Sequence, residues 1–317
     1  MAAMPRVSVG IPVYNGQRYL AEALGSLLAQ TFDDFEIVIA DNASTDRTPD
    51  ICRSYQAKDS RIRYFRNERN LGAAPNFNRV FELSSAPLFH GGACDDLYEP
   101  LFLERCVDVL ERDSSVILSH TRTKLIGDMG EPLLFDEGRD CYVDSYGSTR
   151  GASGDVMRLQ PSHVGEALCP EKRFREVLWL MGWSLPLSGV IRRQALLRTS
   201  LYGNYSGADK VLLADLALQG RFHEVGEDLF AKRIHRGCTH YKSTRERAEH
   251  EATKSQGIPQ VMMLRDYTKM ALAADIGPLQ RLHCMATIVG LARRRDVWRR
   301  LLIPGPDNYL GLSFGHR

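Results

Sequence analysis

The chain has 317 residues, 44% of them hydrophobic, and its 41 basic and 39 acidic residues nearly cancel. This composition is typical of a globular protein with a sizeable core. The balanced charge excludes a global field that would draw the protein to nucleic acid, so no nucleic-acid partner is expected. The seven cysteines are odd in number and form no Cys-x-x-Cys pair, which argues against a disulfide framework and a zinc knuckle. A reducing, cytoplasmic compartment is the simplest expectation.

Neither a secretion signal nor a membrane span is expected. The first predicted strand begins by Val7, which leaves no room for the apolar region of a signal peptide. The longest uncharged stretch, 177–191, is interrupted by Gly182, Ser184 and Pro186 and falls short of the length that a span needs. We interpret this stretch as buried or facing a substrate.

The first third of the chain alternates between strand and helix patterns. Apolar residues at every second position predict a strand over 7–13, and Asn15 is expected to cap the helix whose leucines follow through residue 30. The same reasoning predicts strands at 35–40, 62–65, 88–91 and 116–121 and helices at 49–55, 76–83 and 100–112. Such alternation is typical of a mainly parallel sheet with helices on both faces.

The alternation weakens after the strand at 116–121. Residues 138–170 are rich in Gly, Ser, Asp and Arg and predict a long irregular segment, which either shapes a binding site or is a surface insertion. Helices are expected at 171–181 and 210–218, a last short strand at 229–231, and helices again from about 246. We predict a domain over 1–240, with a donor half to about 120 and an acceptor half over 121–240, and a helical extension over 241–317.

Ligands of parallel sheets bind at the carboxyl ends of the strands, where Tyr14, Asp41 and Asp95 all fall. Asp41 can accept a hydrogen bond from a base N–H or a ribose hydroxyl, or it can serve only in capping the following helix. The first turn, residues 14–17, lacks the Gly-x-Gly-x-x-Gly of dinucleotide-binding proteins, and no P-loop is present. The sequence therefore indicates a nucleotide site of another kind.

Asp95 and Asp96 stand together after the strand at 88–91. Neighbouring side chains of an extended segment point in opposite directions, so one carboxylate can reach a divalent metal while the other reaches a sugar hydroxyl. An exposed acidic turn before Pro100 is the alternative. The upstream segments decide in favour of the metal site.

Four segments carry further motifs. They are Val-Gly-Ile-Pro-Val-Tyr-Asn at 9–15, Ser-Leu-Leu-Ala-Gln-Thr at 26–31, Phe-Glu-Ile-Val-Ile-Ala-Asp-Asn-Ala-Ser-Thr-Asp at 35–46 and Asn-Leu-Gly at 70–72. In this order they resemble the family 2 glycosyltransferases of GT-A fold. The resemblance is dense over about 5–112, extends to about 236, and is absent beyond.

The resemblance implies an α/β fold of GT-A type, with a Rossmann-like, mostly parallel sheet, helices on both faces and a helical C-terminal extension. It also implies a nucleotide-diphosphate sugar donor and a metal bound by an Asp-x-Asp-like element. Ala93 stands where many members have the first Asp, so a strict Asp-x-Asp is missing. The residues assigned to the nucleotide are Pro12, Tyr14, Asn15, Asp41, Asn42, Asn70 and Asp95, and those assigned to Mg²⁺ or Mn²⁺ are Asp96 and His235.

Asp209 resembles the family's catalytic acidic residue, since it precedes a predicted helix and Gly220 follows eleven positions later. Inverting transfer needs a carboxylate that faces the acceptor hydroxyl, and an Asp at a helix N-terminus can serve. The alternatives are that Asp209 only caps this helix or that Asp215 is the base. His235 can bind the diphosphate or the metal, or it can be a surface histidine among arginines.

Arginines interleave with apolar residues over 291–302, the composition of a basic amphipathic helix. This helix can lie on an anionic membrane where a lipid-linked acceptor is presented, or it can dock on the domain with solvated arginines.

Together these features predict an inverting, metal-dependent glycosyltransferase with a saccharide or lipid-linked acceptor, of the kind used in cell-surface polysaccharide or glycolipid synthesis. The alternative is an inactive nucleotide-sugar-binding or regulatory protein of the same fold.

Overall fold

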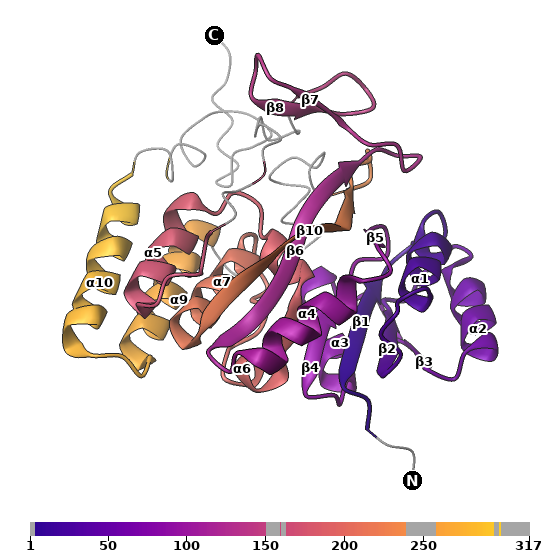
Figure 1. The fold of residues 1–317 in the computed structure, drawn as a ribbon, viewed down its shortest axis with the longest axis horizontal. Coiled ribbons are helices and arrows are strands. Elements are labelled where there is room, and N and C mark those ends of the chain that lie inside the picture. The colour runs from indigo at the N-terminus through magenta and orange to yellow at the C-terminus, as the bar shows by residue number, and fades with distance from the viewer. Residues whose placement is uncertain (1–3, 150–158, 160–162, 239–257, 295–297, 299–317) are drawn as a thin grey trace.

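The computed structural model describes residues 4–149, 159, 163–238, 258–294 and 298, and the remaining residues are drawn as a grey trace in Figure 1. An eight-stranded sheet runs through the molecule in the order β3-β2-β1-β4-β9-β6-β10-β5. Its strands are β1 (Val7–Val13), β2 (Phe35–Asp41), β3 (Ile62–Arg66), β4 (Leu88–Gly91), β5 (Leu97–Tyr98), β6 (Val116–Ile126), β9 (Val190–Arg192) and β10 (Arg221–Arg233). A separate hairpin pairs β7 (Leu134–Asp136) with β8 (Cys141–Val143).

The sheet is mainly parallel, as the alternation of strands and helices predicts. Strand β1 pairs in parallel with β2 and β4, β2 with β3, and β6 with β10. Strand β9 runs antiparallel between β4 and β6, and the short β5 runs antiparallel along the β10 edge. The carboxyl ends of β1 and β2 are level, because Val13 is opposite Asp41 in the register.

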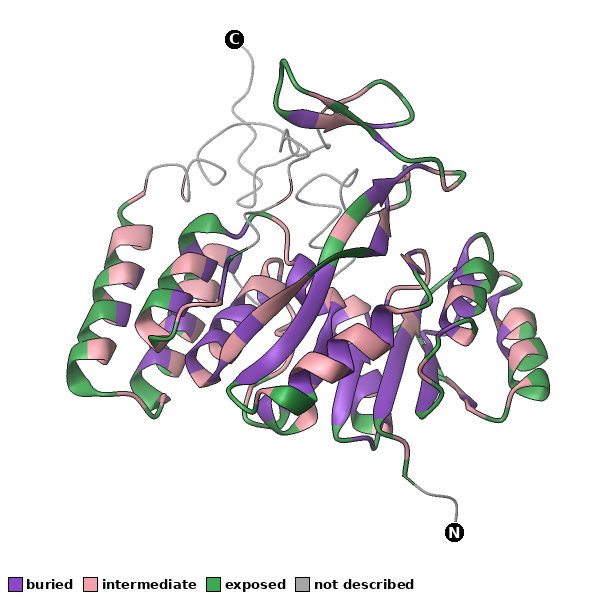
Figure 2. Ribbon diagram, viewed as in Figure 1, coloured by how far each residue is buried: buried purple, intermediate pink, exposed green. Residues whose placement is uncertain are grey.

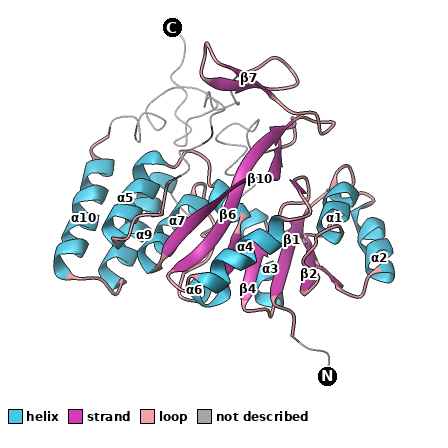
Figure 3. Cartoon of the chain, viewed as in Figure 1, coloured by secondary structure: helices cyan, strands magenta, loops and turns pink. Residues whose placement is uncertain are grey.

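Helices cover both faces of the sheet (Figure 3). They are α1 (Leu20–Leu28), α2 (Thr48–Lys58), α3 (Ala73–Leu83), α4 (Phe102–Arg112), α5 (Pro170–Leu180), α6 (Arg193–Leu197), α7 (Ala208–Gln219), α9 (Pro259–Ala273) and α10 (Pro278–Ala292), with a 3₁₀ turn η1 (Leu185–Ser188). No helix of the described segments combines the length and the apolar character that crossing a bilayer requires.

Two large apolar clusters form the core, and the strands between them are mostly buried (Figure 2). One cluster joins α1, α2 and α4 to the face of β1 that carries Val9 and Ile11. The other joins α3, α5 and α7 to helices α9 and α10 of the C-terminal region, through residues such as Phe174 and Tyr267. Because burial of apolar surface is the main favourable term in folding, α9 and α10 are integral to this core.

The main differences from the sequence-based expectations concern boundaries. Strand β10 begins eight residues before the predicted 229, since its polar N-terminal half is held by pairing with β6, a long-range contact that local patterning does not show. The helix cap predicted at Asn15 is wrong, because α1 begins at Leu20 and Asn15 lies in a loop with φ 51°. The predicted irregular segment 138–170 contains β8, and its residues 150–158 and 160–162 lie outside the described part.

Candidate functional site

The loops after β1 and β2 bind one another at the carboxyl edge of the sheet. The backbone N–H of Asn15 donates to Ser44 Oγ at 2.9 Å, and the N–H of Thr45 donates back to Asn15 Oδ1 at 2.9 Å. Pro12 lies within β1 opposite Ala40, and the Tyr14 side chain beyond the strand is 43% exposed. The structure therefore places Tyr14 on an accessible ledge beside a fixed loop.

Asp41 is fully buried at the end of β2. Its Oδ1 accepts the Ser44 N–H at 2.8 Å, and its Oδ2 accepts the Tyr64 hydroxyl at 2.7 Å and lies 3.3 Å from Arg66 Nε. Burial, and then the hydrogen bond to Asp41, raise the pKa of Tyr64 above its usual value. Both oxygens of Asp41 thus have protein partners, and a nucleotide that contacts them has to displace or share one.

Asparagines beyond β2 form a connected network. Asn42 Nδ2 donates to Asn70 Oδ1 at 2.8 Å, while Asn42 Oδ1 accepts from Asn67 Nδ2 at 3.1 Å and from the Leu71 N–H at 2.9 Å. Asn67 also donates to Asn76 Oδ1 at 2.8 Å. The structure brings the predicted pair Asn42 and Asn70 together, and it adds Asn67 and Asn76, which the sequence analysis missed.

The loop after β4 meets the end of β10. His235 Nε2 lies 3.0 Å from Asp95 Oδ2, whereas Asp96 Oδ1 accepts the Arg233 N–H at 2.9 Å and Asp96 Oδ2 lies 3.8 Å from Lys232 Nζ. The side chain of Asp95 is 24% exposed and that of Asp96 only 4%. His235 is therefore beside Asp95, and Asp95 is the more accessible of the two carboxylates.

Arg233 fixes this loop and was not anticipated from the sequence. Its guanidinium is buried and donates to the Asp95 carbonyl at 2.9 Å, to the Asp128 carbonyl at 3.1 Å and to Glu22 Oε2 at 2.7 Å. It also lies over the Tyr19 ring, 4.8 Å from the centroid. Arg233 thereby joins β10, α1, the turn after β6 and the Asp95 loop. No local pattern could have shown this, since these hydrogen-bond partners are 105 to 211 residues away.

The pKa values of Asp95 and Asp96 are shifted in opposite directions. Burial favours the neutral form of both, but the hydrogen bond from His235 and the charge of Lys232 lower the pKa of Asp95. Burial dominates at Asp96 and raises its pKa to about 6, although Lys232 opposes the shift. Asp95 is therefore the carboxylate that stays ionised over the wider pH range.

Asp209 lies in the first turn of α7, after Gly207, whose φ of 88° ends the preceding loop. Its side chain is half-buried and, within the described residues, makes no hydrogen bond or ion pair. Asp209 acts electrostatically on the candidate site: the pKa of Lys232 is raised first by Asp96, then by Asp95, and also by Asp209, while burial opposes the rise. Asp215, in contrast, lies inside α7 with a hydrogen bond from Gln219 at 3.5 Å.

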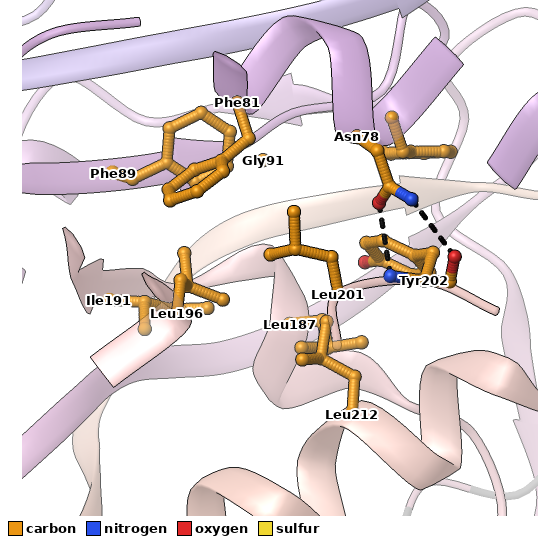
Figure 4. Close-up of a pocket in the computed structure, with 11 residues that line it drawn as sticks. Asn78, Phe81, Phe89, Gly91, Leu187, Ile191, Leu196, Leu201, Tyr202 and Leu212 are labelled. Carbon is orange, nitrogen blue, oxygen red and sulfur yellow. Dashed lines mark hydrogen bonds between the residues drawn. The ribbon is translucent and has the colours of Figure 1, made fainter. Parts of the chain in front are cut away.

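A small apolar cavity lies between α3, β4 and the loop before α7 (Figure 4). Its lining includes Phe77, Phe81, Leu187, Leu201, Tyr202 and Leu212. At its rim, Asn78 hydrogen-bonds the backbone of Tyr202 in both directions, at 2.9 and 3.0 Å. The cavity is thus bounded on one side by a contact between α3 and the loop that leads to Asp209.

The described residues contain no group of three His, Cys, Asp or Glu side chains arranged to hold a metal. Mg²⁺, however, is commonly held by one or two carboxylates together with substrate phosphates, and the partly exposed Asp95 suits that mode. His235 suits it less well as it stands: its Nδ1 accepts the Gly237 N–H at 3.2 Å, so Nε2 carries the proton that is donated to Asp95. His235 becomes a ligand only if this proton moves to Nδ1.

The fold is of the GT-A type. Over 94% of this chain it matches S. aureus TarS in complex with UDP-GlcNAc, with a TM-score of 0.63, 18% sequence identity and 76% of that chain covered. The mannosyltransferase PcManGT from Pyrobaculum calidifontis, in complex with GDP-Man and Mn²⁺, has a TM-score of 0.51 at 15% identity, covering 96% of this chain and 77% of that one.

Residues 8–132 match the model of Glycosyl transferase family 2. An uncharacterized glycosyltransferase of Rickettsia typhi is 35% identical over 132 residues, 41% of this chain and 40% of that protein. One of Nostoc sp. is 28% identical over 260 residues, 80% of this chain and 72% of that protein. The chain therefore spans less than half of the Rickettsia relative. The resemblance found in the sequence is confirmed.

Proposed function

We propose that this protein transfers a sugar from a nucleotide-diphosphate sugar to an acceptor hydroxyl with inversion at the anomeric carbon. The observation that carries the proposal is the position of Asp209. It is an unpaired carboxylate among the described side chains, and its charge acts on Lys232, which is paired with Asp96. The charge of Asp209 is thus felt at Lys232, which supports a base that works together with the acidic loop.

The donor proposal is supported by the family match and by the nucleotide sugars of the structural neighbours, UDP-GlcNAc in TarS and GDP-Man in PcManGT. In this chain Tyr14 offers an exposed ring at the sheet edge, Pro12 lies two residues before it in β1, and the bond from the Asn15 N–H to Ser44 holds the loop that follows. We assign base and ribose to this ledge and to Asp41, with Asn42 and Asn70 holding the adjacent loop through their network.

We assign Mg²⁺ or Mn²⁺ to the loop of Asp95 and Asp96, with His235 beside it. The ion would neutralise charge that develops on the leaving diphosphate. Lys232 and the buried Arg233 keep the loop in place, because they bind Asp96 and the Asp95 carbonyl.

Asp209 would accept the proton of the acceptor hydroxyl as its oxygen bonds to the anomeric carbon. The bond from that carbon to the diphosphate oxygen breaks at the same time, and the nucleoside diphosphate leaves with the electron pair. Attack opposite the leaving group inverts the configuration, and holding both reactants in line lowers the entropic part of the barrier.

The proposal also includes a saccharide or lipid-linked acceptor and a role in the cell envelope. It further includes a cytoplasmic location and a peripheral contact with the membrane. The membrane contact depends on the arginines of 291–302, most of which lie outside the described residues. Co-sedimentation with anionic vesicles tests it: a variant with Arg294→Glu and Arg299→Glu should sediment less, since each basic residue near such a surface contributes about 1 kcal/mol.

Ala93, which interrupts the Asp-x-Asp pattern, favours one alternative, a nucleotide-sugar-binding protein without activity. Thermal unfolding with UDP, GDP and dTDP, each with and without Mn²⁺, identifies the nucleotide, because selective binding raises the unfolding temperature. Release of that nucleotide from its sugar conjugates then separates the candidates. Turnover supports the transferase, whereas binding without turnover in the presence of candidate acceptors supports the inactive protein.

A further inference from the structure

The loop before Asp209 is held at two points by different parts of the chain. On one side, Asn78 of α3 accepts the Tyr202 N–H at 3.0 Å and donates to the Tyr202 carbonyl at 2.9 Å, as Figure 4 shows. The loop has left-handed backbone at both ends, with φ 55° at Leu201 and φ 88° at Gly207. Glycine adopts this conformation freely, but at Leu201 it persists only where the surroundings hold it.

On the other side, the loop is held by α9 of the C-terminal region. The hydroxyl of Tyr205 donates to Asp266 Oδ2 at 2.6 Å, and the Tyr205 side chain is buried. Two residues later, a Cβ added at Gly207 would lie only 2.8 Å from Met263 Sδ, so α9 packs directly on the backbone that starts α7. Both contacts come from one face of α9.

A third residue of α9 connects this packing with Asp209 itself. Tyr267 is fully buried, its ring meets Phe174 edge-on at 6.1 Å, and its hydroxyl has no hydrogen-bond partner among the described residues. Burial raises the pKa of Tyr267, and the charge of Asp209 raises it further. The charge at the start of α7 therefore affects the ionisation of a side chain in α9.

We propose that helix α9 sets the position of Asp209, and that Asp266 is the positioning residue through its hydrogen bond to Tyr205. The inference rests on the proposed function of Asp209 as the base. It assigns a role to a region that the family match, residues 8–132, does not reach. Without the bond, the loop 201–207 loses one of its two anchors and the first turn of α7 gains freedom. Displacement of a catalytic group by about 1 Å can lower a rate on the order of a hundredfold.

Hydrogen exchange on the full chain tests the positioning without any substrate. Tyr205→Phe and Asp266→Ala remove the bond, so amides of the first turn of α7, including Val211, which donates to Gly207, should exchange several-fold faster. Asp266→Asn keeps an acceptor oxygen and should restore slow exchange. Tyr55→Phe removes a comparable hydroxyl bond, from α2 to the Ala21 carbonyl at 2.9 Å, and serves as the matched control. Unchanged exchange in both bond-breaking variants would overturn the proposal.

Turnover then separates this inference from the proposed function. Nucleotide release from UDP-GlcNAc, or from the nucleotide sugar that the thermal panel selects, should slow about ten- to a hundredfold in Tyr205→Phe and Asp266→Ala, with KM for the donor unchanged. In an Asp209→Asn background the same changes should have no further effect. If these changes lower the rate in the Asp209→Asn background as much as they do in wild type, the positioning inference is contradicted while the proposed function stands. If Asp209→Asn itself turns over normally, the proposed base is wrong and the inference falls with it.

Discussion

His235 Nε2 lies 3.0 Å from Asp95 Oδ2, which joins two residues that are 140 positions apart in the sequence. The contact brings the end of β10 to the loop after β4 and lowers the pKa of Asp95 against the effect of burial. Asp96, one residue further on, faces Lys232 and the Arg233 backbone instead. Two adjacent carboxylates thus have different partners, as extended backbone requires.

Asp95→Ala should remove the metal-dependent part of nucleotide binding. Asp95 is the more exposed carboxylate of the pair. Without it the metal loses a protein ligand, and the charge of the diphosphate is no longer compensated. Titration calorimetry with and without Mn²⁺ measures this, with Asp50→Ala as a control because Asp50 is an exposed carboxylate of α2. Asp96→Ala is expected to weaken the same binding. Full Mn²⁺-dependent affinity in both variants would show that the metal is bound elsewhere.

Asp41→Ala should weaken nucleotide binding without changing the preference for Mn²⁺ or Mg²⁺. The variant leaves the Tyr64 hydroxyl and the Ser44 N–H without their acceptor, so the ledge beside Tyr14 is disturbed, and we expect a loss of about 1–3 kcal/mol. Binding is measured by calorimetry and unfolding by urea titration on the same samples. Wild-type affinity together with lower stability would confine Asp41 to a structural role.

Asp215→Asn should stabilise the protein at alkaline pH. Burial raises the pKa of Asp215 to about 6 from an ordinary value of 3.8, although the Gln219 hydrogen bond opposes the shift. Between these values the folded protein holds a proton that the unfolded chain releases. The contribution of Asp215 to the free energy of unfolding is therefore most favourable below about pH 4, and it is lost as the pH rises through about 6.

Above that range the half-buried carboxylate is ionised, at a cost on the order of 1–3 kcal/mol that asparagine avoids. Urea unfolding of wild type and Asp215→Asn at about pH 4 and about pH 8 gives the comparison. The expected result is a gain at the higher pH only, with turnover preserved. A strong loss of turnover would instead make Asp215 the base.

The sequence predicted the sheet and the edge at which its first parallel strands end, because both depend on local periodicity. Alternating apolar residues in β1 and the largely apolar run of β2 place Tyr14 and Asp41 where these parallel strands end. Arg233 and Asn67 could not be predicted, since each is defined by partners that only the folded chain brings near. Asn15 shows the same limit: it matches a helix cap locally, but the loop after β2 holds it in a left-handed conformation.

The identity of the base is the central claim, and Asp209→Asn tests it most directly. Asparagine keeps the size of the side chain and, in the first turn of α7, loses only the small interaction of a negative charge with the helix dipole, but it does not take up a proton at neutral pH. The measurement is single-turnover transfer by wild type and variant, with the nucleotide sugar identified by the thermal panel and its acceptor. The account predicts a rate lower by about 10²- to 10⁴-fold with unchanged nucleotide affinity. A rate within a few-fold of wild type would contradict it and leave Asp209 as a residue of the helix start.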